Sequence, residues 1–362
     1  MLSPYTGYQI SSDTYKDYIP PRDFVGYGTG RYASRTVNDQ VKLLYSPGGP
    51  ETWPNGKKLL VSFILNYEGG GETTIWNGDK ASEGLLHETS SYRQPIQGVR
   101  DPVVESLFEY SIRAGFPRIL KLFDKYKIPF TVWAVGRALE VTQPYAKAMI
   151  ERGHEIADHG WKWRTNVDYT GPDDEAEGIR KGIRKMQEIT GRKDVPAGWY
   201  IGSRFLSHKS SRAKVHREEQ TPLLYCSDCY NADLPYWIPS PLTLDGEKDE
   251  GMLMIPYSLV NNDHRFIANG YCGWVTAQDC FEQLKAEFDF LYEEGQQGKP
   301  KMLTFALHNR LIGKPAKFKA LEMFVDYVAN KPDVWVATRR EVALYWREKY
   351  PYERVGPGPY AT

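Results

Sequence analysis

Short apolar runs alternate with longer amphipathic segments along most of this chain. The runs are too short for typical helices, but their length and their content of Val, Ile, Leu and aromatic residues suit buried strands. They lie at residues 58–65, 128–135, 154–157, 197–202, 223–228, 252–259, 301–308 and 334–338. Each of these runs predicts one strand.

Segments with apolar residues at helical spacing separate many of these runs. They lie at residues 106–127, 143–153, 173–191, 276–295 and 317–330. Gly153 ends the second segment, and Thr276 is suited to begin the fourth. Strands that alternate with helices predict an α/β fold with a parallel sheet and helical crossovers. The number of these units favours a closed or nearly closed (β/α) barrel of about seven strands.

The regular pattern divides the chain into a main domain and two flanking segments. Residues 1–55 are rich in Gly, Pro, Tyr and Asp and have no clear period. They are expected to form an extended arm that packs on the domain or on a neighbouring subunit. Residues 56–350 are expected to form the barrel, and residues 351–362 a C-terminal tail.

Charge and targeting signals narrow the possible partners. Lys and Arg together number 46, as do Asp and Glu, so no net field favours nucleic acid or an anionic membrane. No stretch approaches the roughly 20 apolar residues of a membrane span, and the N-terminus lacks the features of a secretory signal. We therefore expect a cytoplasmic protein, with leaderless secretion left open. The four cysteines are too few for a disulfide scaffold and are expected to be free thiols.

Polar residues cluster directly after several predicted strands. Residues 66–68 (NYE) follow the first strand, 158–159 (DH) follow the third, and His308 ends a later one. In a parallel barrel these positions lie on the same C-terminal face, where active sites assemble. Because several polar residues arrive there together and two of them are histidines, the pattern predicts a converging catalytic site.

Four residues are the catalytic candidates. Glu68 precedes a GGG loop and is expected to project over the barrel mouth, although a loop ion pair would also explain it. His159 follows Asp158, which could orient its ring, and the alternative is a core histidine. His308 could protonate a leaving nitrogen or polarise a carbonyl. Asp233 could pair with a histidine or serve a turn.

Eight segments together resemble the NodB-homology, or polysaccharide deacetylase, superfamily, which is carbohydrate esterase 4-like. They are NYEGGGE with NGDK, SLFEYSIRAG, EIADHGWKW, AGWYIG, DCYNADLPYW, PYSLVNNDHRF and LHNRLIGKPA. The resemblance covers roughly residues 20–350. It is to the branch that contains bacterial allantoinase-like proteins and fungal chitin or polysaccharide deacetylases. It implies a distorted (β/α) barrel of about seven strands and hydrolysis of a C–N amide bond.

The resemblance also implies roles for individual residues. Glu68 falls at the position of a metal-ligand Asp, and Asn66 or Tyr67 stands where the base carboxylate would be. His159 matches the first histidine ligand, whereas Trp163 replaces the second.

The general acid of the family also has a counterpart in this chain. His308 matches this acid, with Asp233 or Asp228 as its partner.

The replacement of one histidine bears on the cofactor. A catalytic zinc site normally has three protein ligands and a water. Only Glu68 and His159 remain at the expected positions, unless Asp158, Asp168 or a water completes the set. We therefore expect no metal or a labile divalent metal such as zinc. Without a metal, Glu68 or His159 would act as general base and His308 as general acid.

The substrate has two alternatives. An N-acetylglucosamine oligomer would need aromatic faces, which could come from Trp76, Trp161, Trp163, Trp199, Tyr200, Tyr236 and Trp237. A small cyclic ureide would need amide and guanidinium donors, which could come from Asn261, Asn262, Arg265, Asn309 and Arg310.

A local departure from the allantoinase-like pattern favours the sugar. In those relatives, the segment that follows GWY usually carries Arg directly after its Gly. Here Ser203 follows Gly202, and the arginine stands one position later, at Arg204. We therefore predict deacetylation of chitin-type amino sugars. Metal-free allantoinase activity is the alternative, and a catalytically dead carbohydrate-binding barrel is the third possibility. The resemblance also implies a homo-oligomer, a tetramer or dimer.

Overall fold

The computed structural model describes residues 53–85, 87–90, 93–163, 172–201, 209–230, 232–238, 250–267 and 273–352. Most of the predicted arm and most of the predicted tail therefore lie outside the described residues, as do Ser203, Arg204 and Asp168. No helix among the described residues is long and apolar enough to cross a membrane.

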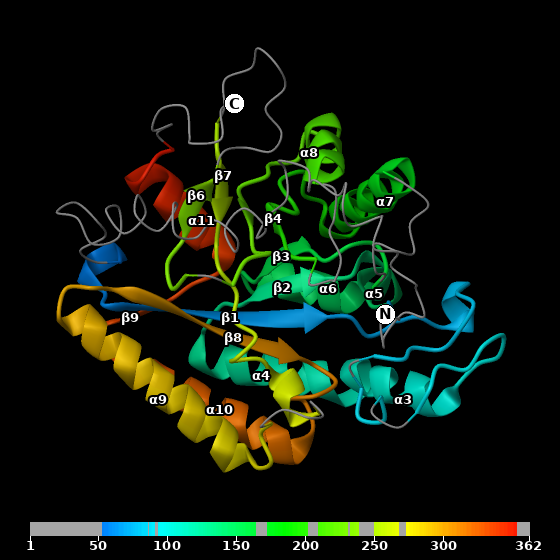
Figure 1. Ribbon diagram of the computed structural model, residues 1–362, viewed down its shortest axis with the longest axis horizontal. Coiled ribbons are helices and arrows are strands. Elements are labelled where there is room, and N and C mark those ends of the chain that lie inside the picture. The colour runs from blue at the N-terminus through cyan, green and yellow to red at the C-terminus, as the bar shows by residue number, and fades with distance from the viewer. Residues whose placement is uncertain are drawn as a thin grey trace, which may run out of the picture.

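The strands of the described residues form one sheet at the centre of the molecule (Figure 1). They are β1 (Leu59–Tyr67), β2 (Thr131–Ala134), β3 (Glu155–Asp158), β4 (Gly198–Trp199), β5 (Tyr225–Cys226), β6 (Tyr236–Ile238), β7 (Met252–Met254), β8 (Lys301–His308) and β9 (Val334–Val336). Their order is β6-β7-β5-β4-β3-β2-β1-β8, and β9 pairs with β1. All pairs are parallel except β6 with β7.

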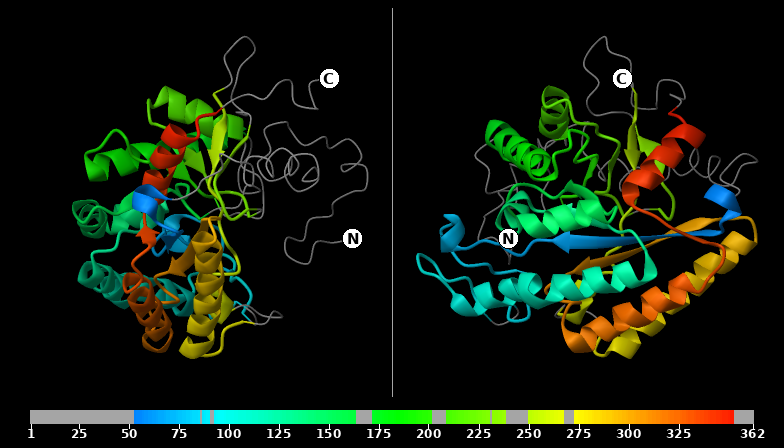
Figure 2. Two further views of the ribbon diagram at one scale, coloured as in Figure 1. Left: turned by 90° about the vertical axis from the view of Figure 1, so that its left-hand side faces the viewer. Right: turned by 180° about the vertical axis from the view of Figure 1, so that it is seen from behind.

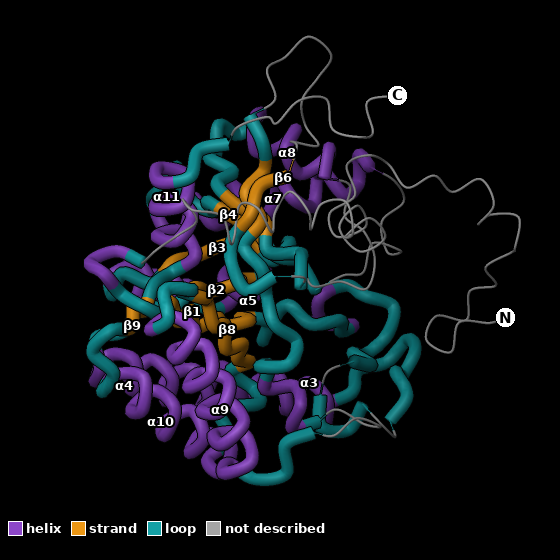
Figure 3. Tube along the Cα trace, turned by 60° about the vertical axis from the view of Figure 1, so that its left-hand side comes forward, coloured by secondary structure: helices purple, strands orange, loops and turns teal. Residues whose placement is uncertain are grey.

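The sheet curls into a half-barrel because the chain after β7 returns to β8, at the other end of the strand order. Asn262 forms a parallel bridge with Ala306 of β8, and the Ala306 N–H donates to the carbonyl of Asn261 at 2.8 Å. Figure 3 shows the strands gathered at the centre, with helices around them. The predicted α/β barrel with parallel strands is confirmed.

Helices cover the outside of the curled sheet. They are α3 (Pro102–Tyr110), α4 (Phe116–Tyr126), α5 (Gly136–Val141), α6 (Gln143–Glu151), α7 (Pro172–Thr190), α8 (Lys209–Glu218), α9 (Ala277–Gln296), α10 (Pro315–Ala329) and α11 (Arg339–Lys349). In Figures 1 and 2, α4, α9 and α10 lie below β1 and β8, while in Figure 1 α7 and α8 lie above β2 and β3. The largest apolar core fills the space between these strands and helices.

The helix predicted over 106–127 is interrupted. A π-helical turn at Ser111–Gly115 separates α3 from α4. A Cβ atom on Gly115 would lie 1.9 Å from the carbonyl oxygen of Asn309, so only glycine fits. This close approach packs the π-helical turn against the loop that follows β8, where His308 ends the strand.

Arg339 organises the interior of the barrel. Its side chain is fully buried and lies 5.4 Å from the Trp133 ring centroid. The guanidinium donates to the carbonyls of Ile255 and Pro256 at 2.8 and 2.9 Å. It also donates to Ser227 Oγ at 3.1 Å and Thr304 Oγ1 at 2.9 Å. One cation thus links the irregular backbone that follows β7 to strand β8.

Replacing this cation tests its structural role. Arg339→Leu should lower the free energy of unfolding by at least about 3 kcal/mol, because several buried acceptors lose a charged donor. Arg340→Leu is the matched control, since the Arg340 side chain is 37% exposed and pairs with Asp194, and it should cost less than about 1 kcal/mol. Urea unfolding of both variants measures the difference. Equal losses would contradict the assignment.

Candidate active site

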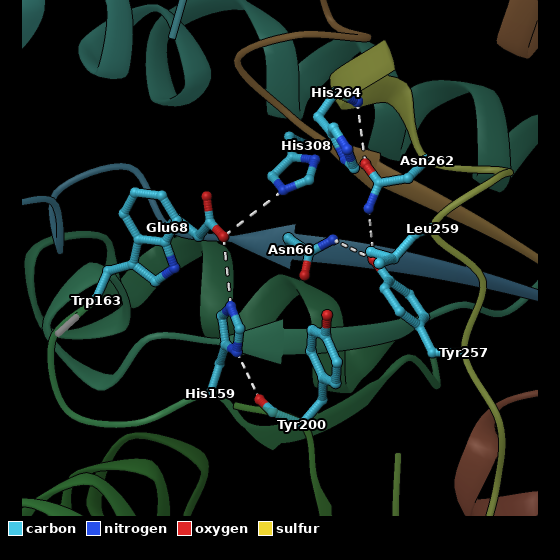
Figure 4. Close-up of a pocket in the computed structure, with 10 residues that line it drawn as sticks. All are labelled: Asn66, Glu68, His159, Trp163, Tyr200, Tyr257, Leu259, Asn262, His264 and His308. Atoms are coloured by element: carbon cyan, nitrogen blue, oxygen red, sulfur yellow. Dashed lines mark hydrogen bonds and ion pairs between the residues drawn. The ribbon is translucent and has the colours of Figure 1, made fainter. Parts of the chain in front are cut away.

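Three predicted residues meet at the C-terminal ends of neighbouring strands. Glu68 follows β1, His159 follows β3, and His308 is the last residue of β8. Asn66 of β1 is in register with His308, so parallel pairing places their strand ends side by side. All three side chains are buried and line the same pocket (Figure 4). The structure thus brings together the acid and the two histidines that the sequence selected.

Glu68 lies at the centre of this group. One carboxylate oxygen, Oε1, is 3.3 Å from Nε2 of His159 and 3.7 Å from Nε2 of His308. The other, Oε2, accepts a hydrogen bond from Nη1 of Arg310. Burial alone would raise the pKa of Glu68, but the positive charges of Arg310 and His308 lower this pKa below its ordinary value. Glu68 is therefore ionised at neutral pH.

A backbone carbonyl fixes the ring of His159. Nδ1 lies 2.6 Å from the carbonyl oxygen of Tyr200, which can only accept a hydrogen bond. Nδ1 must therefore carry a proton, and Nε2 is the atom turned toward Glu68. The Tyr200 N–H in turn donates to the carbonyl of Asp158 at 3.0 Å, which ties this arrangement to the end of β3.

A buried carboxylate fixes the ring of His308. Nδ1 lies 2.6 Å from Oδ1 of Asp263. The second oxygen of Asp263 accepts the backbone N–H groups of His308 at 2.7 Å and Ile312 at 3.0 Å. A carboxylate oxygen accepts hydrogen bonds, so Nδ1 of His308 is the donor and Nε2 faces Glu68.

The predicted partner of His308 was wrong. Asp233 has an exposed side chain, and its carbonyl accepts from the N–H of Met302, near the opposite end of β8. Asp228 accepts from the N–H of Ile201 at 3.0 Å. The sequence did not single out Asp263, which lies in the segment PYSLVNNDHRF at the start of a short 3-10 helix and not at the end of a strand.

The pocket has a cavity volume of about 80 Å³, several times what one water requires. Three of the predicted substrate-binding residues line it: Asn66, Trp163 and Tyr200. Four further lining residues were not in the predicted site: Tyr257, Leu259, Asn262 and His264. Only Asn262 had been named among them, as a donor for a ureide. Burial, together with the charge of His308, lowers the pKa of His264 to about 4, so its ring is neutral.

Strand geometry excludes Tyr67 from the pocket. Successive residues of a strand point to opposite faces, so Asn66 points inward and Tyr67 outward. The Tyr67 hydroxyl donates to Thr142 Oγ1 at 2.7 Å, and its ring packs against Phe116.

Other predicted contacts are also excluded. Trp199 and Tyr236 are buried together in a separate apolar cluster, and Trp237 Nε1 donates to the carbonyl of Tyr350 at 2.7 Å. Asn261 donates to Glu287 at 2.6 Å, and Arg310 is fully buried behind Glu68.

The residues that the structure describes, which do not include Asp168, do not fit a three-ligand zinc site. No group of three His, Cys, Asp or Glu side chains among the described residues is arranged to hold a metal ion. The guanidinium of Arg310 occupies one oxygen of Glu68, and its positive charge opposes a dication there. Trp163 stands where the family places a second histidine, and it lines the pocket with its ring. Glu68 and His159, the two predicted metal ligands, therefore gain no third protein ligand among the described residues.

A second buried carboxyl lies in the loop after Glu68. Glu72 is 6% exposed, and its Oε2 accepts the backbone N–H of Gly70 at 2.6 Å. Burial, reinforced by the negative charge of Glu83, raises the pKa of Glu72 from its ordinary 4.5 to about 7. This carboxyl therefore ionises near neutral pH within the loop that carries Glu68.

Comparison with known proteins finds similarity to polysaccharide deacetylases and to an allantoinase. A family model described as polysaccharide deacetylase matches residues 97–219. A Schizosaccharomyces pombe protein, provisionally named a polysaccharide deacetylase, is 39% identical over 312 residues, which cover 85% of this chain and 96% of that protein. A solved structure of a probable polysaccharide deacetylase from Pseudomonas aeruginosa is 39% identical with a TM-score of 0.74, covering 86% of this chain and 99% of that one. The structure of Puue allantoinase is 40% identical with a TM-score of 0.75, covering 86% and 98%.

The raised pKa of Glu72 makes stability depend on pH. The folded protein binds this proton more tightly than the unfolded chain, so the contribution is complete below pH 4.5 and is lost as pH rises through about 7. Glu72→Gln should therefore be more stable than wild type at about pH 8, by roughly 3 kcal/mol, and little changed at about pH 4. Urea unfolding at both pH values checks this. Glu109→Gln, at a 53% exposed side chain, is the control, and an unaltered pH dependence in Glu72→Gln would contradict the assignment.

Proposed function

Because the chain belongs to the polysaccharide deacetylase family, we propose that it hydrolyses C–N amide bonds and deacetylates N-acetylglucosamine units of chitin oligomers or a related polysaccharide. One observation carries the proposal. An ionised Glu68 lies between the Nε2 atoms of two imidazoles, one of which is held by the carboxylate of Asp263. Such an arrangement suits proton transfer to and from a reacting amide.

The first step is the attack of water on the amide carbonyl. Nε2 of His159 accepts a proton from the water while the water oxygen forms a bond to the carbonyl carbon. The resulting imidazolium lies 3.3 Å from Oε1 of Glu68, whose negative charge stabilises it. Arg310 keeps Glu68 ionised for this task, and the carbonyl of Tyr200 holds the ring in place.

The second step is the departure of the amine. The protonated Nε2 of His308 donates its proton to the amide nitrogen, and the C–N bond breaks to leave an amine and a carboxylic acid. Asp263 stabilises the imidazolium before this transfer. The proton on His159 then returns to His308 along the shared oxygen of Glu68, which is 3.3 Å from one ring and 3.7 Å from the other.

The pocket suits a small acyl group with a larger body outside. Its cavity of about 80 Å³ is lined by Trp163 and Tyr200, whose aromatic rings can contact an acetamido group. Leu259 at the mouth is 49% exposed, and Tyr230, which bonds to the Tyr200 hydroxyl at 2.9 Å, is 50% exposed. These two side chains are available to contact sugar rings outside the cavity.

A cyclic ureide is the second candidate substrate. The likeness to an allantoinase structure at 40% identity favours it, and so do the amide groups of Asn66 and Asn262 in the pocket. The same proton transfers would open a cyclic amide.

The two substrates are compared on one preparation, by measuring acetate release from chitotetraose and hydrolysis of allantoin. We expect acetate release that a chelator does not abolish, because the described residues do not fit a three-ligand metal site. Asp263→Asn should lower kcat by about 1,000-fold or more, because His308 loses its orienting carboxylate. Asp233→Asn, at an exposed side chain, is the matched control.

Three other outcomes would each contradict a different part of the proposal. Turnover of allantoin alone would replace the sugar by the ureide. Turnover of neither compound would overturn the proposed function. Equal kcat values for Asp263→Asn and Asp233→Asn would overturn the role given to His308.

A further inference from the structure

The hydroxyl of Tyr257 receives two hydrogen bonds inside the pocket. Nδ2 of Asn66 lies 3.3 Å from the hydroxyl oxygen, and Nδ2 of Asn262 lies 2.9 Å from it (Figure 4). An amide NH₂ group can only donate, so the phenolic oxygen accepts both bonds. Its two lone pairs are thereby occupied.

The orientation of both amides is fixed by the backbone. Nδ2 of Asn66 also donates to the carbonyl of Leu307 at 3.2 Å. Oδ1 of Asn262 accepts the N–H of His264 at 3.0 Å. Flipping the first amide would set two acceptors against each other, and flipping the second would set two donors against each other. Both NH₂ groups must therefore point at Tyr257.

The hydroxyl proton of Tyr257 therefore has no acceptor among the described residues, because it cannot point at either amide nitrogen and no other group takes it. Tyr257 lines the same cavity as Glu68 and His308. In Figure 4 its hydroxyl and the Glu68 carboxylate lie on opposite sides of Asn66. Burial raises the pKa of Tyr257 well above its ordinary value, so the proton stays on the oxygen.

We propose that Tyr257 is the oxyanion donor of this site. The inference rests on the proposed function, because it concerns the carbonyl of the same amide. When water adds to the carbonyl carbon, the π electron pair moves to the carbonyl oxygen, and the Tyr257 hydroxyl donates a hydrogen bond to that negative oxygen without losing its proton. The pair returns to form C=O as the C–N bond breaks. Two asparagines hold the hydroxyl in advance, so no reorganisation is needed during the reaction.

Removing the hydroxyl tests this role. Tyr257→Phe keeps the ring and should lower kcat by about 100- to 1,000-fold, the loss typical of one oxyanion donor, with KM changed less than about threefold. Tyr67→Phe is the matched control, because it also removes a buried hydroxyl, one that donates to Thr142 outside the pocket. Its kcat should equal that of wild type. An unchanged kcat in Tyr257→Phe would overturn the proposal.

A fluorinated tyrosine distinguishes a hydroxyl that donates to the oxyanion from one that only positions the two asparagines. Placing 3-fluorotyrosine at position 257 makes the hydroxyl a stronger donor and a weaker acceptor. A donor to an oxyanion should keep kcat within about twofold of wild type or raise it. If the hydroxyl only holds Asn66 and Asn262, the fluorinated protein should lose both kcat and thermal stability. That result would overturn the donor role.

The proposal can fail independently of the proposed function. If wild type hydrolyses neither sugar nor ureide, the function fails, and calorimetric binding of methylphosphonate, a tetrahedral oxyanion, still tests the donor. We expect binding at least about tenfold weaker in Tyr257→Phe than in wild type and unchanged in Tyr67→Phe. Equal binding in wild type and Tyr257→Phe, or no binding by wild type, would overturn it.

Discussion

The buried ion pair between Glu68 and Arg310 is the interaction on which the site depends. Both side chains are almost inaccessible to solvent, and a carboxylate in such a place would take up a proton if it had no cation beside it. Because Arg310 follows His308 at the end of β8, the cation and the second imidazole arrive together. The guanidinium also lies 4.8 Å from the ring centroid of Phe108, which links this strand end to α3. The charge that organises both histidines is therefore part of the packing of the barrel.

Groups behind the pocket determine which atom each imidazole presents. The carbonyl of Tyr200 holds Nδ1 of His159, and Asp263 holds Nδ1 of His308. Asp263 lies in the chain that leads from β7 to β8, and it is in turn fixed by the backbone N–H groups of His308 and Ile312. That chain is anchored by Arg339, which binds the carbonyls of Ile255 and Pro256. The geometry of the catalytic face thus depends on a cation in the barrel interior.

The meeting of Glu68, His159 and His308 could be predicted, because parallel strands bring their carboxyl ends to one face. Tyr67 could also have been placed, since strand alternation turns it away from Asn66. Asp263 and Tyr257 could not be found in this way. Both follow the short strand β7 in a segment without a period, Tyr257 on irregular backbone and Asp263 at the start of a 3-10 helix (Asp263–Phe266), and the site residues that they contact, His308 and Asn66, are distant in sequence. Residue type was equally uninformative for Trp199, because a buried core and a sugar pocket both favour aromatic side chains.

The ¹⁵N chemical shifts of the rings of His159 and His308 show which nitrogen of each ring carries a proton, and they are the first measurement to make. Both rings should carry a hydrogen-bonded proton on Nδ1 across the pH range in which the protein is folded. Their Nε2 signals should move when Glu68 is replaced by Gln, since this carboxylate faces both atoms. A neutral ring in either histidine with the proton on Nε2 and none on Nδ1 would contradict the account.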